Sequence, residues 1–183
     1  MSEPDDMILI QAYIGGDGKA FEVLYHRYRR QLYGYLCNLL SNNSADADEI
    51  FEETWIKVID KLSSYQDQGK FSAWLFRIAR NVFIDTMRKK KRSFLSADQE
   101  EIPEIPDWSG RPGRALEEEE SVRILEDALA ELPVEQREVF LMRQQELSFK
   151  EISEIQGCSI NTVLGRMHYA VRNLKKILTG KVN

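Results

Sequence analysis

The side chains best suited to recognise another molecule are five polar residues in the last third of the sequence: Asn161, Thr162, Arg166, His168 and Tyr169. Apolar residues repeat at helical spacing between them, so the five fall on one polar face of a predicted helix. A helix with such a face fits the DNA major groove, where its side chains reach base edges. An ordinary helical hairpin, whose polar face is merely solvated, is the alternative.

The segment before this helix has the features of a helix-turn-helix. Ile152 and Ile155 lie three residues apart on a short amphipathic helix. Gly157 is placed to end that helix, because glycine adopts a left-handed C-cap without strain. Ser159 can then cap the second helix through its hydroxyl. Together with the basic residues that follow, this pattern predicts DNA binding.

A second surface combines cations with aromatic rings. Residues 70–92 carry many Lys and Arg against a single acid, Asp85. Unpaired bases stack on aromatic rings while Lys and Arg contact their backbone, so this composition favours single-stranded nucleic acid. Tyr65 and Phe71 flank a polar loop and are the better candidates for a base pocket, whereas Trp74 fits a core role equally well. The basic run at the end of the segment would by itself be a solvated helix end.

Composition places the chain among ordinary soluble proteins. It has 183 residues, a formal net charge of -5 and 43% hydrophobic residues. No apolar run approaches the ~20 residues that span a bilayer, and the acidic N-terminus lacks the basic start of a signal peptide. We therefore expect a cytoplasmic protein without membrane insertion. Cys37 and Cys158 lack metal-ligand spacing, so they indicate structural thiols, with no metal site and no cofactor.

Helical periodicity runs along most of the chain, and strand signals are nearly absent. We expect an all-α protein with two small domains, a four-helix domain over residues 1–92 and a helix-turn-helix domain over residues 116–183. Residues 93–115, rich in acids, prolines and glycines, are typical of a flexible linker. We expect this linker to be disordered in the free protein, without stable packing between the two domains.

The caps of the helices can also be predicted. Within the first domain we expect Ser44 to cap the third helix, with acids favoured near its positive end. In the second domain, Pro133 is expected as the first residue of a helix, where its missing N–H is tolerated. The expected helices of the first domain are Asp5–Ile14, Lys19–Leu40, Ser44–Leu62 and Phe71 to about Arg92.

Three motifs, in this order, resemble the extracytoplasmic-function (ECF) sigma factors, the small sigma-70 class with only regions 2 and 4. Residues 46–55, DADEIFEETW, resemble region 2.2. Residues 71–81, FSAWLFRIARN, and the basic run that follows resemble regions 2.3–2.4. Residues 132–148 and the helix-turn-helix resemble region 4. The resemblance covers nearly the whole chain.

The resemblance implies a sigma factor that directs core RNA polymerase to promoters and helps open DNA at the −10 element, and not an enzyme. Region 2 would bind the β′ clamp and hold a flipped −10 base, and region 4 would contact the β flap and read the −35 duplex. An anti-sigma factor is the implied regulator. Residues 93–115 would pass through the RNA-exit path of the polymerase, with a plain spacer as the alternative.

Three sets of site residues follow from the resemblance. The polymerase-binding set combines acids with apolar groups expected to be exposed: Asp48, Glu49, Ile50, Glu52, Glu53 and Trp55. The −10 set would lie along the non-template strand: Tyr65, Lys70, Phe71, Trp74, Arg77, Arg80, Asn81, Arg88 and Lys89. The −35 set lies on and around the recognition helix: Arg143, Ser159, Asn161, Thr162, Leu164, Gly165, Arg166, His168 and Tyr169.

The recognition helix departs from the family pattern. Leu164 and Gly165 stand where members often have Lys or Arg and then Ser, and Tyr169 stands where Arg is frequent, so fewer cations face the groove. Glycine within a helix costs ~1 kcal/mol relative to alanine, so Gly165 indicates a close approach of DNA or of a partner. Arg166 can pair with a guanine or grip a phosphate, and the sequence leaves both open.

Two other classes of protein remain as alternatives. A polymerase-independent regulator with a helical sensor domain accounts for residues 115–183, but not for the aromatic and basic helix or the acidic 46–53 stretch. An enzyme would need a phosphate loop, a metal-ligand pattern or a nucleophile–base pair, and the sequence displays none of them. Promoter-dependent transcription with core polymerase separates the three classes.

Overall fold

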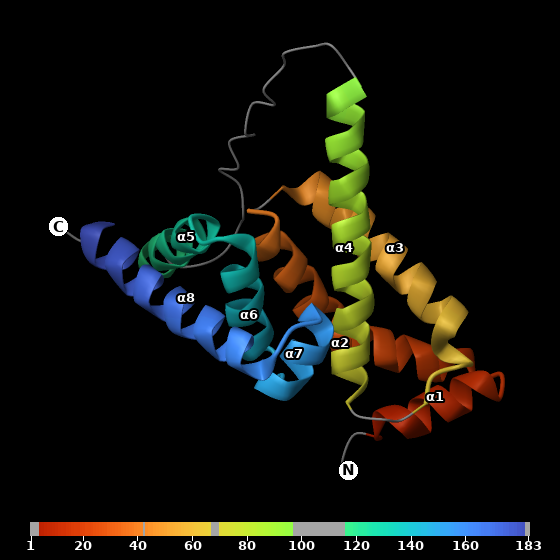
Figure 1. The fold of residues 1–183 in the computed structure, drawn as a ribbon. Coiled ribbons are helices and arrows are strands. Elements are labelled where there is room, and N and C mark those ends of the chain that lie inside the picture. The colour runs from red at the N-terminus through yellow and green to blue at the C-terminus, as the bar shows by residue number, and fades with distance from the viewer. Residues whose placement is uncertain (1–3, 42, 67–69, 97–115, 182–183) are drawn as a thin grey trace.

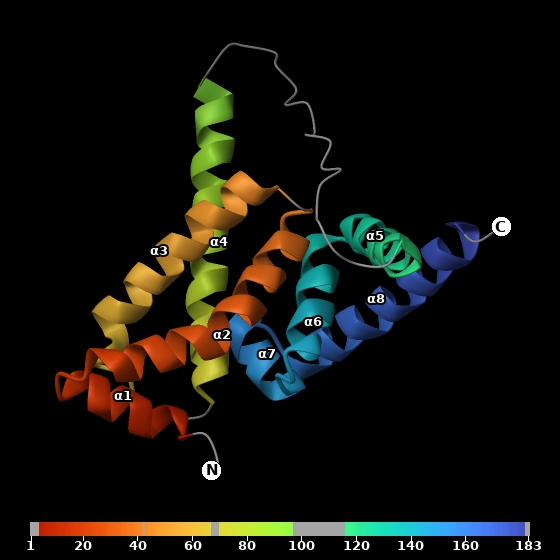
Figure 2. The same cartoon turned by 180° about the vertical axis from the view of Figure 1, so that it is seen from behind.

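The structure, a computed structural model, describes residues 4–41, 43–66, 70–96 and 116–181. All the regular elements in these ranges are helices, so the expected all-α class is confirmed. The helices form two groups that lie side by side (Figures 1 and 2). The first group is α1 (Asp6–Ile14), α2 (Gly18–Leu39), α3 (Ser44–Leu62) and α4 (Phe71–Ser96); the second is α5 (Leu116–Ala130), α6 (Val134–Gln144), α7 (Phe149–Gln156) and α8 (Ile160–Lys181).

Side-chain caps start the first three helices. Asp5 and Asp17 accept hydrogen bonds from backbone N–H groups at the start of α1 and α2. The cap of α3 is Asn43, whose Oδ1 accepts from the backbone N of Asp46 at 3.3 Å. The prediction that Ser44 caps α3 is therefore wrong by one residue, because Ser44 already lies in the first turn of the helix.

The helix-turn-helix is confirmed in detail. Gly157 ends α7 in the left-handed conformation, with φ 64°. The Ser159 hydroxyl accepts from the backbone N of Thr162 at 3.1 Å and so caps α8. Ser148 and Glu151 form a reciprocal capping box at the start of α7. Pro133 precedes α6 with ψ 141°, an extended conformation, so it occupies the cap position and not the first helical position that was predicted.

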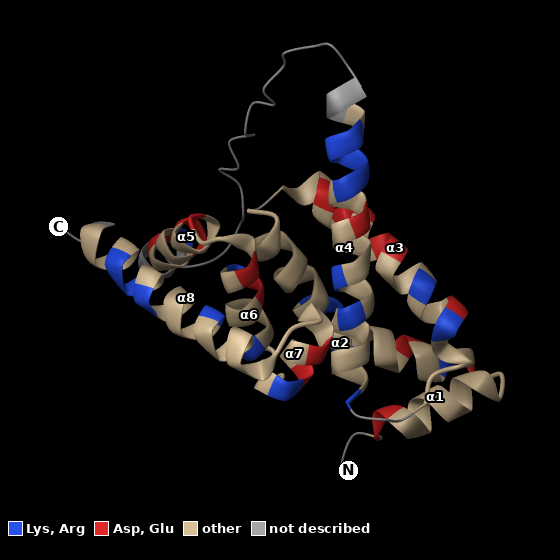
Figure 3. Cartoon of the chain, in the orientation of Figure 1, with Lys and Arg blue, Asp and Glu red and all other residues tan. Residues whose placement is uncertain are grey.

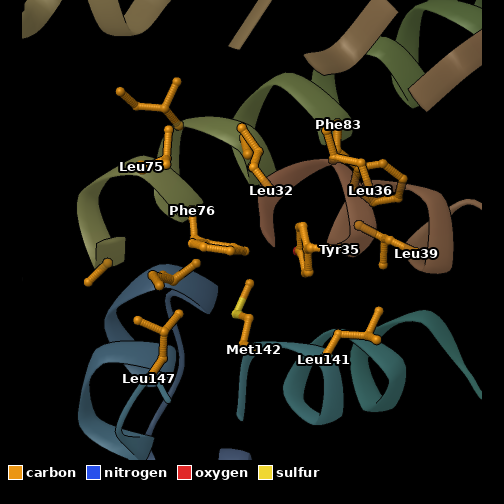
Figure 4. Close-up of a cluster of buried hydrophobic side chains, with 14 of the residues drawn as sticks. Leu32, Tyr35, Leu36, Leu39, Leu75, Phe76, Phe83, Leu141, Met142 and Leu147 are labelled. Carbon is orange, nitrogen blue, oxygen red and sulfur yellow. The ribbon is translucent and has the colours of Figure 1, made fainter. Parts of the chain in front are cut away.

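The two groups share one apolar core, contrary to the expectation that they would not pack together. Tyr35 and Leu39 of α2 and Phe76 of α4 face Leu141 and Met142 of α6, as Figure 4 shows. All five side chains are buried. The expectation failed because α2 and α4 are apolar on more than one side, and a second apolar stripe needs a second neighbour.

Arg137 fastens α6 to the ends of two other helices. Its Nη1 donates to the carbonyl oxygen of Leu39 at 2.8 Å and to Oγ of Ser41 at 2.7 Å, at the C-terminus of α2. Its Nη2 donates to the carbonyl oxygens of Ala130 and Leu132, at the C-terminus of α5. Burial lowers the pKa of Arg137 from its usual value. The guanidinium thus satisfies carbonyl groups that helix ends leave without partners.

The region predicted to be a linker lies mainly outside the described residues. Residues 93–96 continue α4 beyond its expected end, and residues 97–115 are not described. None of the helices in the described ranges is long and apolar enough to cross a membrane. Among the same residues, no group of three or more His, Cys, Asp or Glu side chains is arranged to hold a metal ion.

Candidate promoter and polymerase surfaces

The acidic residues of α3 lie on its outer side. Asp48, Glu49 and Glu52 are exposed, and Glu53 is half-buried beside Lys57, with an Oε1–Nζ distance of 2.8 Å. Figure 3 shows acids and lysines along the same helix. The two groups of helices meet where α2 and α4 pack against α5, α6 and α7, so this acidic side of α3 is left uncovered (Figures 1 and 3).

The apolar members of the polymerase-binding set are not exposed. Ile50 is fully buried and Trp55 is 5% exposed, within a cluster of aromatic rings. The exposed apolar side chains of α3 are instead Ile56, 59% exposed, and Ile59, 41% exposed. Helical register explains the difference, because the buried stripe of α3 passes through Ile50 and continues at three- and four-residue intervals, whereas Ile56 and Ile59 fall beside it.

The −10 set divides into exposed polar residues and a packed aromatic cluster. Within the cluster, the Trp74 ring lies 4.9 Å from the Tyr65 ring and 5.5 Å from the Phe71 ring, measured between centroids. Tyr65 and Trp74 are half-buried, so each keeps part of its ring accessible. Phe71 is 2% exposed, so its predicted stacking face is covered in this structure. The exposed polar residues of the set are Lys70, Arg77, Asn81, Arg88 and Lys89.

Arg80 and Arg77 of α4 face acids of the second group of helices. Nε of Arg80 donates to both oxygens of Glu138, at 3.1 and 3.2 Å. The Arg77–Glu154 pair is looser, with 3.4 Å between Nη2 and Oε2. Burial raises the pKa of Glu138, while Arg80 and Gln156 act in the opposite direction. In Figure 3, a red segment of α7 lies beside a blue segment of α4.

The basic run at the end of α4 is not wholly solvated. Lys90 forms an ion pair with Asp46 at the start of α3. Arg88, Lys89 and Lys91 are exposed. They border a hollow between α3 and α4, together with Glu53 and Lys57. The run therefore combines a structural contact between helices with exposed cations suited to a phosphate backbone.

The −35 set is largely open to solvent. Two arginines of the set are held by other groups of the chain. Nη1 of Arg166 donates to Oε1 of Gln156 at 2.7 Å and lies 3.5 Å from Sγ of Cys158. Arg143 is also held, since it donates to the carbonyl oxygen of Leu147 and lies 4.7 Å above the Phe149 ring. The residues of the set that are exposed are Ser159, Asn161, Thr162, Leu164, His168 and Tyr169.

Gly165 lies mid-helix on this open side. A Cβ atom built there would meet nothing within 4 Å. Packing within the chain therefore does not account for this glycine, and we continue to interpret it as a point of close approach from outside.

Sequence reasoning missed the residues that join the two groups. Glu138, Glu154 and Gln156 belong to none of the predicted sets, although they hold Arg80, Arg77 and Arg166. The sequence carries no clear signal for them, because a buried glutamate between apolar residues reads as a solvated helix acid. Ile56 and Ile59 were also missed, and here helical register gave a usable signal.

Comparison with known proteins decides the family. The sigma-70 region 2 family matches residues 24–93, and the sigma-70 region 4 family matches residues 123–174. The chain is 32% identical over 171 residues to the ECF RNA polymerase sigma factor SigW of Bacillus subtilis, covering 89% of this chain and 91% of SigW. The chain belongs to the ECF sigma factors. Its first group of helices contains region 2 and its second group contains region 4.

Other relatives agree with this assignment. The ECF RNA polymerase sigma factor SigE of Mycolicibacterium smegmatis is 32% identical over 140 residues, which span 76% of this sigma factor and 54% of that longer protein. The fold is similar to the sigma factor RpoE in its co-crystal structure with the anti-sigma factor NepR from Bartonella quintana, with 25% identity and a TM-score of 0.75. That likeness covers 88% of this chain, so it extends over both regions.

Proposed function

We propose that this ECF sigma factor recruits core RNA polymerase through α3, engages the −10 element through α4 and reads the −35 element through α8. The proposal keeps the domain assignment of residues 1–92 to polymerase and −10 binding and of residues 116–183 to −35 binding. The observation that carries it is the presence, on one chain of this family, of two separate helices with exposed polar and basic side chains and one uncovered acidic face.

The α3 surface suits a protein partner. Glu49 and Glu52 orient the partner by charge, while the exposed Ile56 and Ile59 supply apolar contact area. These isoleucines replace Ile50 and Trp55, which serve the core. We propose the β′ clamp of the polymerase as the partner of this face and the β flap as a partner of region 4.

The α4 surface suits a melted strand. Extruding a base costs a few kcal/mol, and stacking on an aromatic ring returns ~1–3 kcal/mol per base. The accessible parts of Tyr65 and Trp74 offer such stacking, and Asn81 offers both a donor and an acceptor to a base edge. Lys70, Arg88 and Lys89 contact the phosphates. Phe71 supports the pocket from beneath as the ring against which Tyr65 and Trp74 pack.

The α8 surface suits duplex DNA. Asn161 and Thr162 lie in its first turn, where free backbone N–H groups favour a phosphate. The exposed Leu164 and Tyr169 supply apolar and aromatic contacts in place of the missing cations. Arg166 gives up its hydrogen bond to Gln156 and donates instead to a guanine base or to a phosphate of the DNA.

The remaining assignments concern regulation and context. An anti-sigma factor is the proposed regulator, as in the complex of the related RpoE. Residues 93–115 connect the two regions and, by the family resemblance, pass along the RNA-exit path. The protein acts in the cytoplasm as a transcription initiation factor and not as an enzyme.

A transcription assay with purified core polymerase tests the proposal. The sigma factor alone should bind promoter DNA weakly, and with core polymerase it should support transcription from promoters that carry defined −10 and −35 elements. Selection from a randomised promoter library with the reconstituted polymerase identifies the sequences of both elements. Tight, specific binding of the isolated chain to an operator, without polymerase-dependent transcription, would instead identify the polymerase-independent regulator.

A further inference from the structure

A buried polar chain connects the two regions. Glu138 of α6 accepts from Nε of Arg80 at 3.1 Å and from Nε2 of Gln156 at 2.8 Å. The side chain of Glu138 is 2% exposed and that of Arg80 is 16% exposed. Nη1 of Arg80 also donates to the carbonyl oxygen of Ile155 at 3.4 Å, near the end of α7. These acceptors of Arg80 all belong to region 4.

The chain extends to the recognition helix. Oε1 of Gln156 accepts from Nη1 of Arg166 at 2.7 Å, so Glu138 and Gln156 link Arg80 of the −10 set to Arg166 of the −35 set. If one member of such a buried pair is removed, the other charge stays buried without a partner, and this lowers the stability of the closed arrangement. Each arginine is thus occupied by a protein acceptor that DNA would have to replace.

The closed arrangement cannot serve both promoter elements at once. Elements centred about 25 base pairs apart are separated by roughly 80 Å of B-form DNA at 3.4 Å per base pair. In the structure the side chains of Glu138 and Gln156 are enough to bridge Arg80 and Arg166. Region 4 must therefore leave α4 before the two arginines can reach their separate elements.

We propose that Glu138 is an intramolecular latch that withholds Arg80 from the −10 strand and, together with the shared apolar core and Arg137, keeps the free sigma factor closed. The inference rests on the proposed function of α4 in −10 binding, with Arg80 placed along the non-template strand as the family resemblance implies, and it adds the regulation of that contact. The closed state covers the Arg80 side of α4 but leaves the acidic side of α3 open, so polymerase can dock before the latch opens. When only a fraction of the molecules is in the binding-competent state, the apparent Kd for the ligand is the intrinsic Kd divided by that fraction.

The same interface provides a matched control. Arg77 and Glu154 also join α4 to region 4, but their side chains are 45% and 51% exposed. Exposed pairs of this kind contribute little to stability because water screens them. Glu154→Gln therefore removes the same charge from the same interface as Glu138→Gln, without touching the buried network.

The experiment compares four versions of the 183-residue chain: wild type, Glu138→Gln, Arg80→Gln and Glu154→Gln. Small-angle X-ray scattering gives the radius of gyration, and fluorescence anisotropy gives the affinity for random-sequence single-stranded DNA without polymerase. Wild type and Glu154→Gln should be compact and bind weakly. Glu138→Gln should have a larger mean radius of gyration than wild type and bind about tenfold more tightly, because losing one contact between the regions raises the competent fraction. Arg80→Gln should show the same increase in radius of gyration without that gain in affinity.

Several results would overturn the latch. They are an extended wild type, a Glu138→Gln variant with the radius of gyration of wild type, a Glu138→Gln variant with a larger radius of gyration but unchanged affinity, or an equal gain in affinity in Arg80→Gln. Circular dichroism checks folding, and if Glu138→Gln loses helix, the scattering of Arg80→Gln decides, because that substitution breaks the same bond from region 2. Failure of the proposed function would appear separately, as a wild-type chain that directs no promoter-specific transcription with core polymerase.

Discussion

The two helices proposed to bind DNA, α4 and α8, differ in how accessible their proposed binding residues are. The exposed side of α8 would need no rearrangement to enter a major groove, apart from the bond between Arg166 and Gln156. On α4, by contrast, region 4 covers Arg80 and pairs with Arg77, and Phe71 is buried. Under the proposed function, −35 reading would therefore use a preformed surface, whereas −10 reading would require separation of the two regions.

The largest effect is expected at Asn81, which is exposed on α4 and forms no part of the latch. Asn81→Ala should lower promoter-dependent transcription roughly a hundredfold, the upper end of the ~1–3 kcal/mol that a specific base contact contributes. The loss should persist on promoters already melted at −10, because the contact is made to an unpaired base, and the response to −10 substitutions should weaken. Asp85→Ala, one turn further along α4, is the control, and an unchanged response to −10 substitutions would remove the −10 role of Asn81.

The next largest effect is expected at Arg166 of α8, the arginine proposed to contact the −35 element. Arg166→Ala should cost ~1–3 kcal/mol and relax preference at one −35 position if the side chain reads a base, whereas a phosphate contact would weaken all sites alike. Transcription across a −35 substitution library, with core polymerase present, distinguishes the two. Lys175→Ala, an exposed cation further along α8, serves as the control. Unchanged transcription from every member of the library in Arg166→Ala would exclude both roles.

The acidic side of α3 should behave independently of the latch. Charge reversal in the double variant Glu49→Lys and Glu53→Lys should weaken binding to core polymerase about tenfold, because complementary charges orient the encounter. Glu138→Gln should leave that affinity unchanged, since region 4 does not cover this face. Glu22→Lys with Asp127→Lys gives the same net charge at exposed sites elsewhere. Equal losses in both double variants would show a nonspecific charge effect.

The smallest effect is expected at Gly165. Gly165→Ala should raise the free energy of unfolding by up to ~1 kcal/mol, since alanine favours the helix and the added Cβ has free space. If DNA approaches closely at this point, −35 affinity should fall at the same time. Gly34→Ala in α2, which also has free space, should give the stability gain alone. Chemical denaturation measures the stability, and unchanged −35 affinity in Gly165→Ala would argue against a close approach.

Local features proved predictable because local chemistry decides them. In the turn of the helix-turn-helix, Gly157 has a left-handed backbone and Ser159 caps the next helix with its hydroxyl. Both features could be predicted from the residue types alone. The error at Asn43 and Ser44 was a choice between two adjacent residues that can both cap. Periodicity also separates the inner from the outer side of α3, although it had to be followed residue by residue to find Ile56 and Ile59.

The packing between the regions was not predictable in the same way. Tyr35, Phe76 and Met142 are apolar residues on amphipathic helices, and periodicity says only that each is buried, not against which partner. Glu138 is harder still, because its burial depends on Arg80, which lies 58 positions away in the sequence. The acidic, proline-rich composition of residues 93–115 led us to expect two domains without stable packing between them, and this expectation was wrong.

The central claim is that region 2 and region 4 read different promoter elements after separating. Transcription by core polymerase with the wild type, Arg80→Ala and Arg166→Ala, on a library substituted at both the −10 and −35 elements, tests it most directly. We expect both variants to lower transcription, with Arg80→Ala leaving the response to −35 substitutions unchanged and Arg166→Ala leaving the response to −10 substitutions unchanged. A change at −35 caused by Arg80→Ala, a change at −10 caused by Arg166→Ala, or wild-type transcription in both variants would contradict it.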